Sequence, residues 1–100
     1  MLDIKRYENK IKKICASLHL KKLALFGSAT TDLFGPESDV DILVEFGVRP
    51  DENLFDTYFT LKSELEKIFH RPVDIVVERS VKNPFLKQTI NSTRKVVYAG

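Results

Sequence analysis

The stretch from residue 23 to residue 46 constrains the fold of this chain most, because two apolar segments enclose a short polar connection. The first segment, residues 23–26, stops at Gly27-Ser28. The second opens after ten further residues with Asp39-Val40-Asp41 and continues to residue 46. Alternate residues of a strand point to the same side, so Asp39 and Asp41 share one face and the apolar residues share the other. The sequence therefore predicts two strands, the second of which begins with two carboxylates on one face.

These two carboxylates need a counter-charge. Their Cα atoms would lie roughly 6.6 Å apart along a strand, and two ionised carboxylates at that spacing repel each other. A divalent cation removes the repulsion, and ligands made only of oxygen favour Mg²⁺ or Mn²⁺ over zinc. The competing interpretation is a solvated acidic strand face, which fits less well because aspartate is disfavoured in strands. We therefore predict that Asp39 and Asp41 bind metal.

Gly27 and Ser28 are the candidate phosphate contacts. Glycine has no Cβ, so the backbone can approach a ligand closely there, and Ser28 adds a hydroxyl and a backbone N–H. A short helix expected from about Ala29 would point free N–H groups at an anion. Thr30 and Thr31 fit a phosphate contact or a turn and cap role equally well. Phosphate donors beside a carboxylate-bound metal are what phosphoryl or nucleotidyl transfer requires.

The combination of Gly27-Ser28, a ten-residue spacer and Asp39-Val40-Asp41 resembles the nucleotidyltransferase signature of the DNA polymerase β superfamily. The small size resembles the minimal nucleotidyltransferases, the MntA-type antitoxins that are partnered with HEPN-domain toxins. The resemblance covers nearly the whole chain and includes residues 73–77, the strand expected to carry a third carboxylate, Asp74. Either dipeptide pattern alone is common, whereas the combination at this spacing is specific.

The resemblance implies a reaction and a partner. Asp39 and Asp41 would hold one or two Mg²⁺ ions that bridge the triphosphate of a nucleotide. Asp74 would complete the second metal site and help to deprotonate an acceptor hydroxyl, which attacks the α-phosphate as pyrophosphate leaves. In the minimal family the implied acceptor is a tyrosine of the partner HEPN toxin, a ribonuclease that transfer of AMP from ATP would neutralise.

One departure from the family pattern concerns charge. Relatives often carry an arginine one or three residues after the motif serine, where this chain has Ala29 and Thr31. A cation for the triphosphate is therefore missing from the loop. Three explanations stay open: Mg²⁺ and backbone amides suffice, a partner supplies the charge, or the activity is weak.

Two other functions stay open as well. A non-catalytic antitoxin would neutralise its partner by covering it, although such a module has no use for the carboxylates. Transfer to an RNA end or to a small molecule is the other alternative. One hundred residues fit a single domain, residues 1–100. Because no second domain shapes an acceptor pocket, acceptor specificity is expected to come from a hetero-oligomeric partner chain.

Composition narrows the class further. There is no apolar run of 18 residues, no signal peptide and a single cysteine, so we expect a cytoplasmic protein with no membrane contact and no zinc site. Residues 1–22 hold seven Lys and Arg against two acids, about +5, and the remainder holds nine against twelve, about −3. The basic leading segment is interpreted as a solvated surface, and attraction of nucleic acid or of an acidic protein face is the alternative. For the protein as a whole, direct nucleic-acid binding is not expected.

Hydrophobic periodicity predicts a mixed α/β (α+β) fold with a mixed sheet and helices mainly on one face. Asp3 is the expected N-cap of the first helix, Cys15 a core residue rather than a nucleophile, and His19 a helix-end residue. The expected elements are a helix over 3–18, a strand over 21–26, helical turns within 29–34, a strand over 39–46, a loop over 47–51, a helix over 53–70, a strand over 73–78, a short helix over 84–91 and a strand over 95–99.

Overall fold

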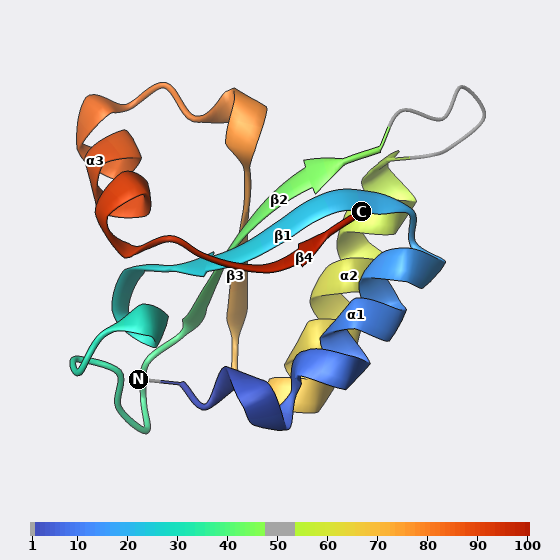
Figure 1. Cartoon of the computed structure of the whole chain (residues 1–100), viewed down its shortest axis with the longest axis horizontal. Helices are drawn as coiled ribbons and strands as arrows, with labels where there is room; N and C mark the ends of the chain where they lie inside the picture. The colour runs from blue at the N-terminus through green and yellow to red at the C-terminus, as the bar shows by residue number, and fades with distance from the viewer. Residues whose placement is uncertain (1, 48–53) are drawn as a thin grey trace.

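The computed structural model describes residues 2–47 and 54–100, which form a four-stranded mixed sheet and three α-helices (Figure 1). In chain order the elements are the 3-10 helix η1 (Ile4–Arg6), α1 (Glu8–Ser17), β1 (Leu20–Phe26), the 3-10 helix η2 (Gly27–Thr30), β2 (Val40–Phe46), α2 (Leu54–Phe69), β3 (Val73–Val77), the 3-10 helix η3 (Glu78–Ser80), α3 (Pro84–Thr93) and β4 (Lys95–Ala99).

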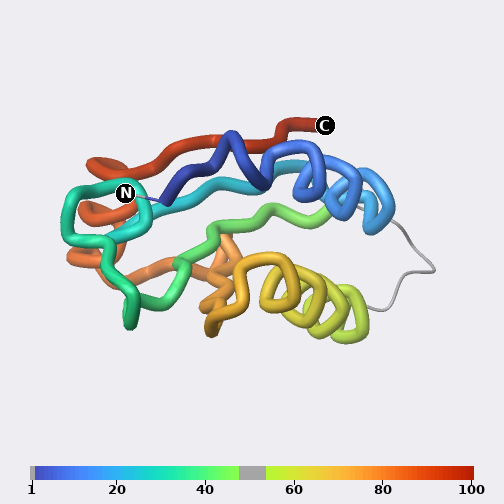
Figure 2. Tube along the Cα trace, turned by 90° about the horizontal axis from the view of Figure 1, so that it is seen from below, coloured from blue at the N-terminus to red at the C-terminus, as the bar shows by residue number. Residues whose placement is uncertain are grey.

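The strands lie in the order β3-β2-β1-β4, which Figure 2 shows as orange, green, cyan and red segments in succession. β1 is antiparallel to both of its neighbours, whereas β2 and β3 are parallel. A parallel pair needs a crossover connection, and α2 supplies it. The end of β1 and the beginnings of β2 and β3 therefore meet at one end of the sheet.

The two faces of the sheet are covered unequally. α1 and α2 lie side by side over one face (Figure 1) and enclose a core in which residues such as Leu23, Ile42 and Leu61 are fully buried. α3 packs on the other face through Ile90, which joins Ala24, Phe26 and Leu43 in a smaller cluster. Two of the three α-helices thus share one face, as predicted, and α3 covers only part of the other.

The element predictions are largely confirmed, with errors at the N-terminus and after Ser28. β4 has the predicted bounds, and α3 extends two residues beyond its predicted end. The predicted helix over 3–18 divides at Tyr7, and Asp3 makes no side-chain cap hydrogen bond. Tertiary contacts explain both errors, because the Leu2 N–H donates to the Ala29 carbonyl (2.8 Å) and Ile4 is buried.

The remaining errors are local. The predicted turns within 29–34 are a 3-10 helix that starts at Gly27 and stops at Thr30, since Thr31 is extended. Glu78 belongs to η3 rather than to the strand before it. Residue 53 of the predicted helix and residues 48–51 of the predicted loop lie outside the described residues.

The basic N-terminal segment is a surface, as its periodicity predicts. Five of its seven cations lie on η1 and α1 and are exposed, namely Lys5, Arg6, Lys10, Lys12 and Lys13. Lys12 pairs with Glu8 one helical turn earlier (3.0 Å), and an exposed pair of this kind contributes only about 0.3–0.5 kcal/mol. His19 is exposed at the end of α1 with a φ of 57°. In the described part of the chain, no helix has the length and apolar character needed to cross a membrane.

Cys15 provides a direct test of the core. Its side chain is fully buried, as predicted, and burial raises the pKa of the thiol to about 12. At pH 8 we expect a chromogenic disulfide reagent to leave Cys15 unreacted until denaturant unfolds the protein. Ala16 is exposed on the same helix, so the control variant Cys15→Ala/Ala16→Cys should react at once. Rapid labelling of the native wild-type protein would contradict this packing.

Candidate active site

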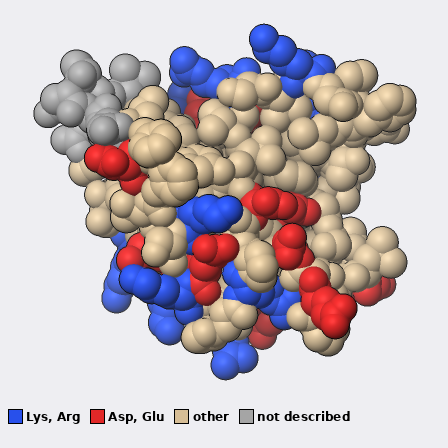
Figure 3. All heavy atoms as spheres, turned by 180° about the vertical axis from the view of Figure 1, so that it is seen from behind, with Lys and Arg blue, Asp and Glu red and all other residues tan. Residues whose placement is uncertain are grey.

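The structure brings the predicted carboxylates together where β2 and β3 begin. Asp41 and Asp74 are ladder partners in this parallel pair, so they lie side by side on one face. Each lies two residues from an apolar residue that packs toward α3, Leu43 on β2 and Val76 on β3, so both face the α3 side of the sheet, where Asp41 is half-buried and Asp74 is exposed. Asp39 is exposed and lies one residue before β2. Seen from behind, the middle of the molecule carries acidic side chains with basic side chains beside them (Figure 3).

The three carboxylates interact electrostatically. Asp41 is half-buried, and its pKa is raised, first by burial and then by the negative charges of Asp74 and Asp39. In the described ranges, none of the three side chains forms an ion pair or a hydrogen bond. The three acids therefore influence one another's charge, and no cation among the described residues pairs with them.

Gly27 lies directly against the most buried of these acids. Its φ is +70°, a conformation that side chains disfavour, and a Cβ at this position would lie 2.6 Å from Oδ2 of Asp41. The sequence analysis explained Gly27 by the need for the backbone to approach a ligand closely. The structure adds a second reason for glycine here, because any side chain would displace the Asp41 carboxylate.

Ser28 is the polar group of this loop that remains available. Its carbonyl accepts hydrogen bonds from the N–H and the hydroxyl of Thr31 (2.9 and 3.1 Å), whereas its own hydroxyl bonds to none of the described residues. The Thr30 hydroxyl lies within reach of two carbonyls, those of Gly27 (3.1 Å) and Thr93 (2.7 Å). Thr30 and Thr31 therefore serve the turn, which is one of the two roles left open for them.

Two residues that shape the site were missed by the sequence analysis. Arg71 Nη1 donates to the carbonyls of Gly35 (3.0 Å) and Ser38 (2.9 Å), and its guanidinium lies 4.4 Å from the centre of the Phe34 ring. Arg71 thus fixes the spacer that leads into Asp39. Thr93 accepts a hydrogen bond from the Gly27 N–H (2.8 Å). Neither contact has a local signal, since each joins residues more than thirty positions apart.

The structure shows what Ala29 and Thr31 do at the two positions where relatives often carry an arginine. Ala29, one residue after Ser28, is buried, and its carbonyl is bonded to the N–H of Leu2. Thr31 uses its hydroxyl within the turn. The two positions therefore provide packing and turn contacts rather than charge.

The donor set suits a hard divalent cation, because it consists of carboxylate oxygens that pair with none of the described residues. Across residues 2–47 and 54–100, however, no three His, Cys, Asp or Glu side chains are gathered closely enough to hold a metal ion. Asp39 and Asp74 are exposed, so packing does not hold their side chains against Asp41. Metal binding by Asp39, Asp41 and Asp74 stays a prediction.

Fold and site together define a class of enzyme, the nucleotidyltransferases. The chain belongs to the nucleotidyltransferase domain family, which it matches over residues 8–97. It is 40% identical over 92 residues to a protein of Methanocaldococcus jannaschii that is provisionally named a protein adenylyltransferase, and the match covers 88% of each chain.

Solved structures agree with this assignment. One described as a minimal nucleotidyltransferase superposes with a TM-score of 0.72 at 26% identity, over 92% of this chain and 90% of the other. A toxin–antitoxin structure with AMP-PNP gives 0.70 at 27% identity, over 93% and 73%. A complex of a tri-AMPylated HEPN toxin with an MNT antitoxin from Shewanella oneidensis gives 0.65 at 26% identity, over 96% and 72%. The predicted resemblance and fold class are confirmed.

The contact between Gly27 and Asp41 generates a stability prediction. Gly27→Ala should lower the free energy of unfolding by about 1–3 kcal/mol, because alanine is strained at positive φ and its Cβ meets Asp41 Oδ2. Gly35→Ala is the matched control, since no atom lies within 4 Å of its added Cβ, and it should change stability by less than about 0.5 kcal/mol.

A double-mutant cycle in urea separates the two causes. In an Asp41→Ala background the contact with Oδ2 is gone, so the cost of Gly27→Ala should shrink to the backbone strain alone. If Gly27→Ala costs no more than Gly35→Ala, the close packing of Gly27 on Asp41 is refuted.

Proposed function

We propose that this protein is a Mg²⁺-dependent adenylyltransferase antitoxin, which transfers AMP from ATP to a tyrosine hydroxyl of a partner HEPN toxin and so neutralises it. The observation that carries the proposal is the in-register pair Asp41 and Asp74, next to the loop of Gly27 and Ser28. Support comes from the M. jannaschii relative and from the structures of toxin–antitoxin complexes, one with AMP-PNP and one with an AMPylated HEPN toxin.

Each site residue then has a stated role. Asp39, Asp41 and Asp74 would hold Mg²⁺, which when bound neutralises charge on the triphosphate and on the leaving pyrophosphate. Gly27 allows the backbone to approach the phosphates, and the Ser28 hydroxyl binds them. Asp74 is exposed and accepts the proton of the acceptor hydroxyl, whose oxygen forms the new bond to the α-phosphorus as the bond to pyrophosphate breaks.

A macromolecular acceptor fits the openness of the site. Asp39 and Asp74 are exposed, and α3 leaves their part of the sheet uncovered. Cavities of about 180–330 Å³ lie beside α3, between α1 and α2, and beside β4, away from the three carboxylates. A protein surface can dock on an open acidic face, whereas a small acceptor is usually bound in a concave pocket. With a ribonuclease toxin as partner, the cytoplasm is the proposed location.

A non-catalytic antitoxin that covers its toxin is the second candidate, and transfer to RNA or a small molecule the third. The carboxylates, which pair with none of the described residues, favour the enzyme, because acids that raise one another's pKa are unfavourable unless they are used.

Removing two of the carboxylates should abolish nucleotide binding without harming the fold. Calorimetry of Asp39→Asn/Asp41→Asn should show no Mg²⁺-dependent binding of ATP, whereas Asp32→Asn, an exposed acid in the same spacer, should bind like wild type. The pKa of Asp41 is raised, so its ionised form is less favourable in the folded than in the unfolded protein at pH 7. The double variant should therefore be at least as stable as wild type. Unchanged affinity for Mg-ATP would refute the site assignment.

Asp74→Asn separates the enzyme from the covering antitoxin. The substitution keeps size and hydrogen-bonding capacity but removes the base, so ATP and toxin should still bind while AMP transfer falls by at least ~10²-fold. Growth rescue of cells that express the toxin should fail in parallel. If Asp74→Asn neutralises the toxin as well as wild type does, the chemistry is dispensable and covering is the better account.

A further inference from the structure

The loop that carries Gly27 and Ser28 is tied to the last residue of α3 by two hydrogen bonds. At the start of η2, the Gly27 N–H donates to Thr93 Oγ1 (2.8 Å). At its end, the Thr30 hydroxyl donates to the Thr93 carbonyl (2.7 Å). Both ends of a four-residue turn therefore converge on one residue that lies more than sixty positions away in the chain.

The Thr93 hydroxyl accepts the hydrogen bond from the Gly27 N–H because its own proton is donated elsewhere. The Thr93 hydroxyl lies 2.6 Å from the Thr89 carbonyl, one helical turn earlier, and it donates its single proton there. The oxygen lone pairs are then left to accept the Gly27 N–H. A side chain of the same shape without the oxygen would leave this N–H without a partner.

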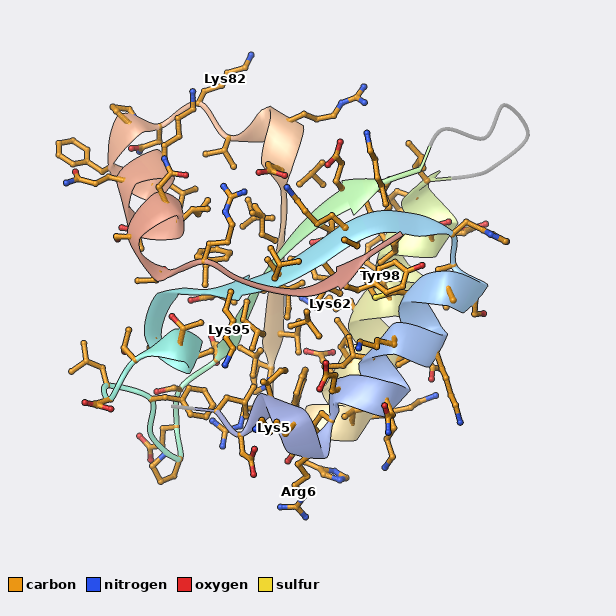
Figure 4. All side chains as sticks on the ribbon, in the orientation of Figure 1. Lys5, Arg6, Lys62, Lys82, Lys95 and Tyr98 are labelled. Atoms are coloured by element: carbon orange, nitrogen blue, oxygen red, sulfur yellow. The ribbon has the colours of Figure 1, made fainter. Side chains whose placement is uncertain are left out.

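The helix that presents Thr93 is itself fixed to the sheet. Ile90 is buried against Ala24, Phe26 and Leu43. Just after the helix, Arg94 pairs with Glu78 (2.7 Å), which also pairs with Lys22 on β1 (2.9 Å). Figure 4 shows Lys95 where the chain passes from α3 into β4, beside the η2 loop. Thr93 is therefore a fixed point against which the loop is held.

We propose that Thr93 is a positioning residue for nucleotide binding. Its hydroxyl orients the Phe26–Gly27 peptide, and thereby the placement of Gly27 against Asp41 and of the Ser28 hydroxyl toward a phosphate. Thr93 itself touches neither the phosphate nor the carboxylates. This inference rests on the proposed function for its effect on ATP, but the hydrogen bond exists in the protein without nucleotide and is testable there.

The test compares Thr93→Val, which keeps the shape and removes the hydroxyl, with Thr93→Ser, which restores it. Thr89→Val is the matched control, because it makes the same change one turn away on α3, where only the backbone carbonyl of Thr89 is used. Thr30→Val removes the other bond and serves as a second variant if Thr93→Val folds poorly. For each protein we would measure the exchange rate of the Gly27 amide without nucleotide, and kcat and KM for ATP with the partner toxin.

In Thr93→Val the Gly27 amide should exchange at least ~10-fold faster, while the amide of Leu43 in the core of the sheet keeps its rate. KM for ATP should rise about tenfold, the equivalent of one hydrogen bond, with a smaller change in kcat. For Thr93→Ser, the exchange rate of the Gly27 amide and KM for ATP should stay within about threefold of the wild-type values. For Thr89→Val, both should equal the wild-type values. If Thr93→Val behaves like Thr89→Val in both measurements, the inference is overturned.

The two proposals fail in distinguishable ways. A wild-type protein that neither binds ATP nor transfers AMP would refute the proposed function, and the exchange rate of the Gly27 amide would still decide whether Thr93 holds the loop.

Discussion

The parallel pairing of β2 with β3 is the constraint on which the site depends, because it places Asp41 beside Asp74. Like charges directly opposite on neighbouring strands cost roughly 0.2–1 kcal/mol. Burial of apolar side chains on the opposite face of the same two strands more than offsets this cost. There Val40, Val73 and Ile42 are buried under the helices, and each fully buried aliphatic side chain contributes about 1.5–3 kcal/mol. The apolar face of the sheet therefore holds an acidic pair that would otherwise move apart.

Around this pair the chain uses contacts from distant segments to fix short loops. Arg71 donates hydrogen bonds to two carbonyls of the spacer before Asp39, and Thr93 accepts a hydrogen bond from Gly27, at the start of the connection between β1 and β2. Gly27 in turn packs on Asp41, so the loop of Gly27 and Ser28 and the Asp41 carboxylate form one connected unit. For the proposed reaction, a loop that is already held in place lowers the cost of ordering it when nucleotide binds.

How far the sequence predicts this arrangement depends on how local each feature is. The alternation of residues 39–46 predicts that Asp39 and Asp41 share a face, and the apolar stripes predict which helix residues form the core. The pairing of Asp41 with Asp74 depends on the strand order, which the family resemblance supplied and periodicity alone does not determine. Arg71 and Thr93 left no signal, because an arginine before a proline and a threonine at a helix end have many ordinary roles. The predicted cap at Asp3 failed for a similar reason, since contacts of Leu2 and Ile4 with the rest of the fold determine the first turn.

The central claim is that the acidic end of the sheet is where nucleotide and metal bind. A crystal of the protein grown with Mn²⁺ and a non-hydrolysable ATP analogue tests it most directly, because the anomalous scattering of manganese locates the metal. The account predicts manganese bound by Asp41 together with Asp39 or Asp74, and phosphate oxygens against Gly27 and Ser28. Manganese and nucleotide in another place, such as the cavity beside Arg94, with the three carboxylates unliganded, would contradict it.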